Sequence, residues 1–344
     1  MKKILIFFGG CSTEYEVSLQ SAAAVLAHLD KSRYQPVLVG ITRQGGWRYY
    51  SGGPEEIAAD RWQAGSVPCL LDPSRGARRL ILLDEDWTCL DFEAALPLLH
   101  GKNGEDGTLQ GLLELADIPL IGCGSLASAL CMDKDRAHKL ARLAGVEAPR
   151  GRVFGRDALA EELAGAAREL GYPLFVKPVR AGSSFGVSRV SEPCQLAEAA
   201  RKAFENDREI LLEEAVPGFE VGCAVLGTRQ LVVGAVDEIQ LAGGFFDFEE
   251  KYTLKTSAIH CPARISSQTA GRIQQAARTV YRALDCKGFA RVDLFLTPEG
   301  KILFNEVNTI PGFTAHSRYP TMMKQIGLDF PTLITRMIET EVEG

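Results

Sequence analysis

Residues 288–312 read GFARVDLFLTPEGKILFNEVNTIPG, in which two apolar runs flank the turn-forming residues TPEG. This pattern predicts a β-hairpin. Antiparallel pairing about that turn sets Arg291 opposite Glu306, and the side-chain period of two puts Asp293 and Asn308 on the same face. The apolar residues between them require the sheet to be packed on both sides. A guanidinium, two carboxylates and an amide are therefore expected in a half-buried place.

This polar face has two interpretations. Half-buried carboxylates need cations nearby. Asp, Glu and Asn supply hard oxygen ligands, which suit Mg²⁺ rather than zinc, and Mg²⁺ held by few protein groups usually brings substrate phosphates with it. The alternative is an ordinary cross-strand Arg–Glu pair, with the Asp and Asn facing solvent. The hairpin alone does not decide between them.

Composition narrows the class of protein. A chain of 344 residues indicates two or three domains, with 46% hydrophobic residues to fill their cores and 24% charged residues to keep them in solution. Nine cysteines without CxxC pairs or histidine spacing favour reduced thiols over disulfides or a zinc site. A net charge of -6 disfavours nonspecific nucleic-acid binding, and no apolar run approaches the length of a membrane span. We expect a cytoplasmic enzyme that acts on small molecules.

The first region, residues 1–124, has the pattern of an open α/β domain. A short buried strand ends at Gly9 and Gly10, and a helix is predicted from about Ser12, where Thr13 and Glu16 have capping-box spacing. A loop-rich insertion follows the second strand. Further strands are predicted at 35–41, 79–83 and 118–121, and a helix from 108.

Two further regions complete a mixed α/β (α+β) chain of three domains. Residues 125–211 form a small central domain that opens with one helix, 125–144, and continues with a second helix, 157–170, among short strands. Residues 212–344 form a C-terminal domain that begins with adjacent strands and contains the hairpin.

Phosphate-binding candidates lie in the central region. Lys177 ends an apolar strand, and the small-residue loop 182–186 follows it, flanked also by Arg180. Such a loop lets backbone N–H groups and serine hydroxyls approach phosphate oxygens closely. Lys134, on the helix after GCG, is a second candidate cation. By themselves, a Gly/Ser hairpin turn and a solvated lysine are the commoner meanings of these patterns.

Two stretches of the C-terminal region complete the candidate set. The segment LLEEAVPGFE has two interpretations. It suits a connection whose backbone faces an adenine, with Glu220 within reach of a ribose. The alternative is a plain strand end. GGFFDFEEKYTLKTS is a long polar stretch typical of a lid, although surface irregularity explains it equally. An alternative hypothesis, that the chain binds a dinucleotide, rests on the motif GCGSLA alone.

In this order and spacing, the segments resemble the ATP-grasp enzymes, and within them the D-alanine–D-amino acid ligases that make the dipeptide end of the cell-wall precursor. The resemblance spans nearly the whole chain. It is carried by GGCSTEYEVSL, HGKNGEDGTLQG, the MDK that contains Lys134, VKPVRAGSSFGVS, LLEEAVPGFE, EEKYTLKTS, GFARVDLF and NEVNTIPGFTAHSRYP.

The resemblance implies ATP and two Mg²⁺ ions, or Mn²⁺ in their place, between the central and C-terminal domains. It assigns the phosphates to Lys134, Lys177 and Lys251, the adenine to Glu213 and Val216, the ribose to Glu220, and the metals to Asp293, Glu306 and Asn308. Metals and lysines would offset the repulsion between a carboxylate and a polyphosphate.

The resemblance also implies a reaction in two steps. The carboxylate of the first D-alanine attacks the γ-phosphate to give an acyl phosphate, and the amine of the second amino acid displaces phosphate. Arg291 and the Gly312 backbone N–H would stabilise the oxyanion of the tetrahedral intermediate.

At the first substrate, the same resemblance places Glu14, which pairs with the ammonium group, and His100. It also implies a hydrogen-bonded set of Glu14, Ser183 and Tyr252 that ties the first domain to the central domain and the lid. Closing that lid would keep the acyl phosphate from water.

The second amino acid is the acceptor of the D-alanyl group. The residues expected around it depart from the commonest pattern of the family. Tyr252 matches members that use an amino acid, not the depsipeptide-forming members that use lactate. Ser317 is expected to bind the acceptor carboxylate, but Arg318 stands where D-Ala–D-Ala ligases usually have leucine. An arginine can hydrogen-bond a hydroxyl and disfavours a pocket without an acceptor, so the pattern resembles resistance-type ligases that take D-serine. Phe246 and Asp237 are expected to shape that pocket, the alternative being that they are ordinary core and turn residues.

The sequence therefore predicts a D-alanine ligase with D-serine as the favoured acceptor and D-alanine also accepted, working as a homodimer. The alternatives are a housekeeping D-Ala–D-Ala ligase, another ATP-grasp carboxylate–amine ligase, a nonenzymatic ATP-binding regulator, and a nicotinamide dehydrogenase. All four polar hairpin residues are present, which argues against the regulator. The dehydrogenase rests on an isolated motif.

Overall fold

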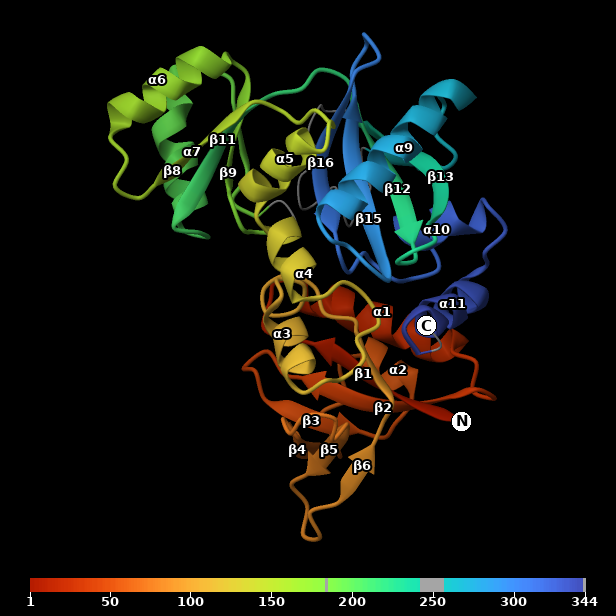
Figure 1. Cartoon of the computed structure of the whole chain (residues 1–344). Coiled ribbons are helices and arrows are strands. Elements are labelled where there is room, and N and C mark those ends of the chain that lie inside the picture. The colour runs from red at the N-terminus through yellow and green to blue at the C-terminus, as the bar shows by residue number, and fades with distance from the viewer. Residues whose placement is uncertain (183–184, 242–256, 343–344) are drawn as a thin grey trace.

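The computed structural model describes residues 1–182, 185–241 and 257–342, and it contains three β-sheets (Figure 1). The first sheet has seven strands in the order β6-β5-β4-β3-β2-β1-β7. Strand β1, next to the edge strand β7, runs parallel to β2 and β7, and the remaining pairs are antiparallel. The strands are β1 (Lys2–Gly9), β2 (Tyr34–Ile41), β3 (Trp47–Tyr50), β4 (Val67–Leu71), β5 (Arg79–Leu82), β6 (Cys89–Asp91) and β7 (Ala94–Pro97).

Helices cover both faces of this first sheet, because β1 is apolar on both sides. Leu5 and Phe7 belong to one core cluster with α3 (Thr108–Leu115), whereas Ile4 and Ile6 belong to another with α1 (Tyr15–His28). The predicted loop-rich insertion contains the strands β3 and β4 and the short helix α2 (Pro54–Ala58), and the strand predicted at 79–83 is β5. The predicted strand 118–121 is only an isolated bridge between Ala95 and Leu120.

Two predicted helix boundaries were wrong. Helix α1 begins at Tyr15, after Glu14 in the N-cap position, and no side chain caps it. The expected Thr13–Glu16 capping box does not form, because Glu16 pairs with Arg43 instead.

The helix predicted over 125–144 is two helices, α4 (Ser125–Met132) and α5 (Lys134–Leu143). Asp133 lies between them in an extended conformation, and its carboxylate accepts a hydrogen bond from the Arg136 backbone N–H at 3.0 Å. This N-cap makes Lys134 the first residue of a helix.

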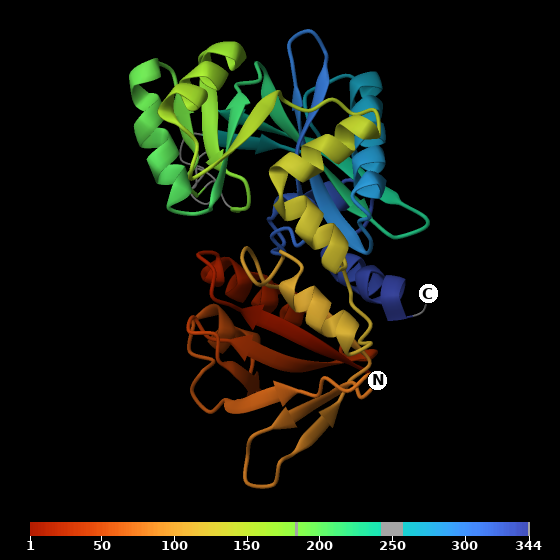
Figure 2. The same ribbon diagram turned by 60° about the vertical axis from the view of Figure 1, so that its left-hand side comes forward.

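The second sheet is antiparallel, in the order β10-β9-β11-β8. Its strands are β8 (Gly151–Gly155), β9 (Leu174–Pro178), β10 (Ser188–Val190) and β11 (Glu209–Glu214), and its helical elements are α6 (Ala160–Leu170), η1 (Pro193–Gln195) and α7 (Leu196–Phe204). Helices α6 and α7 cover its outer face, as Figure 2 shows. The inner face looks toward α5 and the third sheet.

The third sheet has the order β14-β13-β12-β15-β16 and is also antiparallel. Its strands are β12 (Phe219–Leu226), β13 (Val232–Leu241), β14 (Ser257–His260), β15 (Phe289–Leu296) and β16 (Ile302–Asn308), followed in the chain by α10 (Arg318–Lys324) and α11 (Phe330–Val342). Helix α9 (Ser267–Ala283) packs on it. The second and third sheets lie side by side above the first (Figures 1 and 2), which confirms the predicted mixed α/β class.

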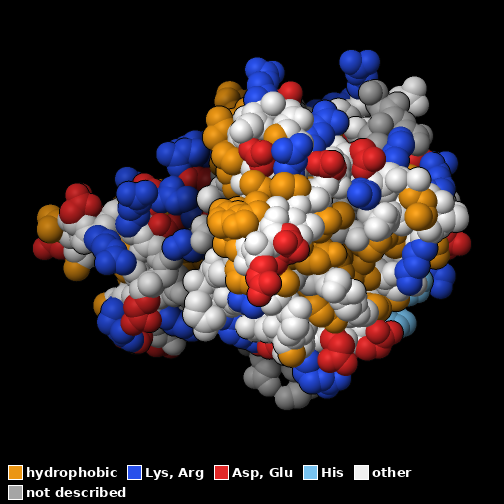
Figure 3. Space-filling model, turned by 90° about the horizontal axis from the view of Figure 1, so that it is seen from below, with side chains coloured by type: hydrophobic (Ala, Val, Ile, Leu, Met, Phe, Trp, Pro, Cys, Tyr) orange, Lys and Arg blue, Asp and Glu red, His pale blue; other side chains and the backbone are white. Residues whose placement is uncertain are grey.

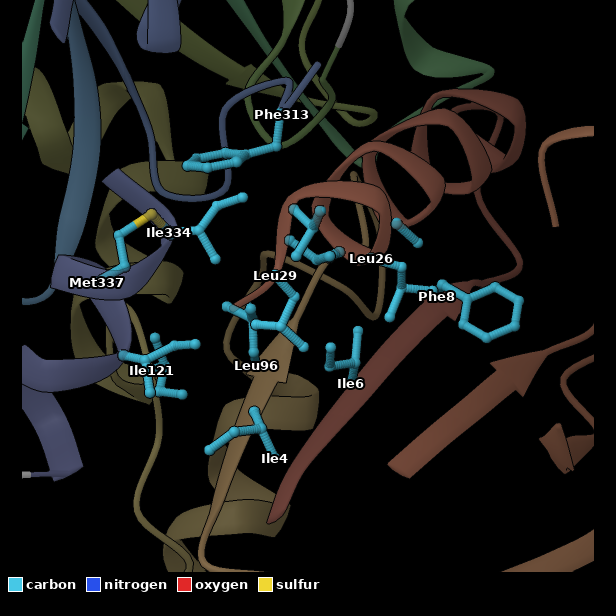
Figure 4. Close-up of a cluster of buried hydrophobic side chains, with 14 of the residues drawn as sticks. Ile4, Ile6, Phe8, Leu26, Leu29, Leu96, Ile121, Phe313, Ile334 and Met337 are labelled. Atoms are coloured by element: carbon cyan, nitrogen blue, oxygen red, sulfur yellow. The ribbon is translucent and has the colours of Figure 1, made fainter. Parts of the chain in front are cut away.

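One hydrophobic cluster joins the beginning of the chain to its C-terminal helices. Ile6 and Leu26, from the first sheet and α1, pack in the same cluster as Phe313, Ile334 and Met337 (Figure 4). The rings of His28 and Phe330 lie edge to face with centroids 5.1 Å apart. The first sheet therefore shares its core with α11.

The surface seen from below mixes charged and apolar side chains (Figure 3). Large exposed apolar residues include Leu70, Trp87 and Leu115. Such scattered residues are normal on folded proteins. Within the described ranges, none of the helices is both long and apolar enough to span a membrane.

Candidate active site

The β15–β16 hairpin forms as predicted, but its register is shifted. Asp293 lies opposite Glu306, and Arg291 lies opposite Asn308 rather than Glu306. The connection spans residues 297–301, and a bulge at Asn305 shifts the pairing again. Each change moves the register by one residue. The predicted Arg291–Glu306 pairing was therefore wrong.

The polar hairpin residues nevertheless lie together on one face. Asp293 accepts from Arg291, with Nε–Oδ1 at 2.8 Å and Nη2–Oδ2 at 2.7 Å, and from Asn308 Nδ2 at 2.9 Å. The Asp293 side chain is only 1% exposed. Burial alone would lower the pKa of Arg291, but the charge and hydrogen bonds of Asp293 together with the charge of Asp237 raise that pKa. A buried carboxylate is thus matched by a guanidinium.

A second arginine enters this cluster from the start of α10. Arg318 donates to Asp237 twice, and its Nη1 donates to Glu220 at 3.0 Å. Its Nη2 also lies 3.4 Å from Asp293 Oδ1. A Cβ atom added to Gly222 would lie 2.3 Å from the Arg318 guanidinium, so the glycine makes room for it. Glu220, expected at a ribose, pairs with Arg318 here.

The donor chemistry of the hairpin fits Mg²⁺. Glu306 and Asn308 line a small cavity that Lys134 and Glu105 also line, and Asp293 pairs across the ladder with Glu306. Among the residues described, no group of three or more His, Cys, Asp or Glu side chains is placed to hold a metal ion. Mg²⁺ usually binds one or two carboxylates and takes its other ligands from water and phosphates. Two carboxylates and an amide therefore match such an ion.

Two candidate phosphate lysines come from α5 and β9. Lys134 Nζ donates to the Ala181 carbonyl oxygen at 2.7 Å, which places it against the loop after β9. Lys177 Nζ lies 2.6 Å from Glu213 Oε1, and both side chains are almost fully buried. Val216 is half-buried in the connection that follows β11.

Arg180, predicted to flank a phosphate-binding loop, forms ion pairs within the protein. Its guanidinium pairs with Asp133 at 2.9 Å, with Asp207 at 3.4 Å and with Glu209. These carboxylates neutralise the cation. We therefore assign Arg180 to fixing the α4–α5 junction against the second sheet.

The first-substrate candidates connect the first sheet to the rest of the molecule. His100 Nδ1 lies 2.9 Å from the Ile310 carbonyl oxygen, and Nε2 lies 3.3 Å from Ser21 Oγ. Because a carbonyl only accepts, Nδ1 carries the proton and Nε2 accepts from the hydroxyl. Burial lowers the pKa of His100. The neutral ring therefore fits its two partners.

Glu14 lies where two glycine loops meet. A Cβ atom on Gly101 would lie 2.9 Å from Glu14 Oε2, and one on Gly182 would lie 3.0 Å from the same oxygen. Larger residues there would displace the carboxylate. Glu14 therefore contacts both the first and the central regions.

The acceptor-side candidates follow β16. Ser317 is the N-cap residue of α10, and its hydroxyl lies 2.8 Å from Thr314 Oγ1. A Cβ atom on Gly312 would meet that hydroxyl at 3.2 Å, so the Gly312 backbone lies close to Ser317. The candidates Ser183, Phe246, Lys251 and Tyr252 lie outside the described residues.

Sequence reasoning missed two residues of the cleft. Glu105 lines the cavity of Lys134 and Glu306, and burial, followed by the charges of Glu14 and Glu306, raises its pKa well above the usual range. The motif HGKNGEDG was noted, but nothing in it marks Glu105 as a half-buried residue of this cavity. His138, which lies beside Glu213, was also missed, although it is one helical turn after Lys134.

Comparison with known proteins extends over nearly the whole chain. Residues 3–123 match the family model described as "D-ala D-ala ligase N-terminus", and residues 145–339 match "D-ala D-ala ligase C-terminus". Among solved structures, the chain is similar to the VanG D-Ala:D-Ser ligase from Enterococcus faecalis. The two are 52% identical with a TM-score of 0.91, and the match covers 99% of each chain.

Relatives named for other acceptors are also similar. A putative D-alanine–D-lactate ligase of Streptomyces coelicolor is 42% identical, over 99% of this chain and 98% of that protein. A D-alanine–D-alanine ligase of Caldicellulosiruptor bescii is 40% identical, over 99% of this chain and 95% of that protein. Overall similarity therefore does not identify the acceptor.

Proposed function

The chain belongs to the D-alanine–D-alanine ligase family, and from that membership we propose that it joins D-alanine to D-serine at the expense of ATP, with D-alanine as a second acceptor. The product would serve as the end of a peptidoglycan precursor, in wall synthesis or in glycopeptide resistance. The proposed site lies between the second and third sheets and the first-sheet loops that carry Glu14 and His100.

The observation that carries the acceptor proposal is the geometry of Arg318. Its guanidinium is held by Asp237 on β13 and Glu220 on β12, and its side chain is only 10% exposed. A fixed, buried cation offers hydrogen-bond donors to a hydroxyl and opposes an apolar methyl group left beside it. The similarity to the VanG D-Ala:D-Ser ligase supports the same acceptor.

The cleft residues support the ATP and metal assignments. Lys134 and Lys177 would hold the phosphates of ATP. Glu213 and Val216 would contact the adenine. Mg²⁺ would be held by Asp293, Glu306 and Asn308. Bound Mg²⁺ would offset the charge on the phosphate oxygens as the first substrate's carboxylate approaches.

Residues of the chain would then divide the remaining tasks. Glu14 would pair with the ammonium of the first D-alanine, beside His100. Arg291, aligned by Asp293, and the Gly312 backbone N–H would stabilise the oxyanion that forms when the second amine attacks. Ser317 would bind the acceptor carboxylate.

The test compares acceptors in one assay. In the first series, phosphate release is measured with Mg·ATP and a fixed concentration of D-alanine while the concentration of D-serine is varied. In the second series, D-alanine is the only amino acid, and its concentration is varied. The dipeptide products are identified by mass spectrometry. We expect a higher kcat/KM for D-serine. A higher kcat/KM for D-alanine would contradict the acceptor proposal and favour a D-Ala–D-Ala ligase, the activity for which the Caldicellulosiruptor bescii relative is named.

A further comparison tests the donor. Absence of D-alanine-dependent phosphate release, with another amino acid active in its place, would favour a different carboxylate–amine ligase.

Three features stay predictions: the domain boundaries after residues 124 and 211, the homodimer and the cytoplasmic location. Gel filtration with light scattering tests the dimer.

A further inference from the structure

Three buried side chains from three elements meet on the inner face of the second sheet. Lys177 on β9 pairs with Glu213 Oε1 on β11 at 2.6 Å, and His138 Nδ1 on α5 lies 3.6 Å from Glu213 Oε2. The three side chains are between 3% and 9% exposed. Each charge there acts in a medium that screens it poorly.

The trio lies on the face of this sheet that is turned away from α6 and α7. Leu174, Val176, Ile210 and Leu212 pack under α6 and α7, so the alternate residues Lys177 and Glu213 point the other way. Helix α5 runs past that inner face toward the third sheet (Figure 2). The trio is therefore in the place proposed for ATP.

The hydrogen bonds of His138 fix where its proton lies. Nε2 is 2.8 Å from the carbonyl oxygen of Asn305, the bulge residue of β16, and a carbonyl can only accept. Nε2 therefore carries the proton, and the Nδ1 of a neutral ring presents a lone pair to Glu213. In the described part of the chain, Glu213 Oε2 is a buried atom without a hydrogen-bond partner. Two acceptors thus face each other.

Lys177 supplies the positive charge that this arrangement needs. With a neutral His138, the cation paired with the Glu213 carboxylate among the described residues is the Lys177 ammonium. A polyphosphate that attracts Lys177 would leave Glu213 buried without a counter-charge, which is costly. A proton on Nδ1 would restore the balance and give Oε2 a donor.

We infer that His138 takes up a proton when ATP binds, and so replaces Lys177 as the partner of Glu213 while the lysine moves to the phosphates. This inference rests on the proposed function, because it requires ATP in this cleft. His138 acts through Glu213 and Lys177, so it is a positioning residue.

The electrostatic surroundings of His138 agree with this exchange. Burial lowers its pKa in the free protein, Glu213 and the Asn305 carbonyl raise it, and Lys177 and Arg142 lower it. Moving Lys177 away removes one lowering influence and leaves Glu213, so the pKa rises in the complex. Between the two pKa values, binding takes up a proton. Affinity for the nucleotide then falls as pH rises, by up to about tenfold per pH unit.

Isothermal titration calorimetry tests the proton uptake. The Mg²⁺ complex of β,γ-imido-ATP is titrated into the full chain at pH 7 in Pipes and in Tris, whose ionisation enthalpies differ. We expect the heat to depend on the buffer in the wild type, with an uptake of up to one proton. His138→Gln should bind the analogue with that part of the uptake missing, since glutamine cannot take a proton at this pH. His28→Gln, at an exposed site on α1, is the matched control and should keep it.

Equal proton uptake in wild type and His138→Gln would overturn the inference. Protons exchanged by the nucleotide itself are common to both proteins and cancel. If the wild type does not bind the analogue at all, the proposed function fails instead, and the two failures are distinguishable.

Nuclear magnetic resonance gives a second readout that does not depend on the stability of the variant. The chain has five histidines, and the signal absent from His138→Gln identifies the ring. We expect that signal to titrate at a higher pH with the analogue bound than without it. An unchanged or lower midpoint would contradict the inference.

Discussion

Arg318 and Asp237 meet through two hydrogen bonds, Nε to Oδ2 and Nη2 to Oδ1, each 2.8 Å long. Asp237 is fully buried, so its charge depends on the arginine. The paired geometry fixes the plane of the guanidinium as well as its position. The side chain that we propose to select the acceptor is therefore held rigidly from behind.

Replacing Arg318 by leucine should change acceptor preference. We expect the ratio of kcat/KM for D-serine to that for D-alanine to fall by at least about tenfold, because the hydroxyl loses its donor and a methyl group gains an apolar contact. The unpaired Asp237 should also lower the free energy of unfolding, by about 3–5 kcal/mol. Steady-state assays and urea unfolding measure the two effects.

The double variant Arg318→Leu, Asp237→Asn removes the stranded charge and serves as the control for stability. Arg318→Lys keeps the charge but loses the paired geometry, so its ratio should be intermediate. An unchanged ratio in Arg318→Leu would show that the arginine has no part in selecting the acceptor.

Replacing Glu306 by glutamine should raise the Mg²⁺ concentration that gives half-maximal activity, by roughly tenfold or more. The substitution keeps the side-chain size and removes one of two carboxylates proposed to bind the metal. Glu299→Gln is a matched control, because Glu299 is exposed on the turn of the same hairpin. An Mg²⁺ titration of activity that looks the same in both variants would exclude Glu306 as a ligand.

Stability should fall below about pH 6.5 in a way that depends on His100. Burial lowers the pKa of this ring from its ordinary value of 6.5, so the unfolded chain binds the proton first. The contribution of His100 to the free energy of unfolding is therefore full above pH 6.5 and declines as pH falls toward the folded-state pKa.

Urea unfolding of wild type and His100→Gln at several pH values measures this contribution. The difference in the free energy of unfolding should shrink from pH 7 to pH 5.5. A difference that stays constant for His100→Gln would contradict the assignment.

Replacing Ile334 by alanine should destabilise the first sheet, although Ile334 lies about three hundred residues after β1 and α1. Ile334 on α11 is 1% exposed and shares a cluster with Ile6 and Leu26. We expect a loss of about 2–5 kcal/mol and faster hydrogen exchange at the amides of β1. Leu143→Ala, at a side chain that is 84% exposed, should change neither. Faster exchange confined to α11 would mean that the two parts fold independently.

Local pattern predicted the hairpin but not its register. The alternation of apolar and polar residues placed Arg291, Asp293 and Asn308 on one face, and their mutual hydrogen bonds confirm it. The turn length and the bulge at Asn305 depend on tertiary contacts, including the hydrogen bonds from Phe304 N–H to the Glu147 carbonyl and from His138 to the Asn305 carbonyl. Those contacts cross more than a hundred residues of sequence.

The same limit explains the helix boundaries and the missed residues. Thr13 and Glu16 have capping-box spacing, but Arg43 from a distant strand connection competes for Glu16. Glu105 and His138 gain their unusual surroundings only when separate regions pack together. Apolar periodicity reveals a core, whereas a buried charge becomes visible only through its partners in space.

The common core of α1 and α11 has a consequence for synthesis on the ribosome. The strand β1 and helix α1 emerge first, but the side chains that cover them, such as Phe313 and Met337, are translated about three hundred residues later. Until then, the apolar side chains of β1 and α1 in this cluster lack their partners from Phe313 and α11. The nascent chain should therefore depend on chaperones for much of its translation, and a ribosome that stalls before residue 313 should release an aggregation-prone product.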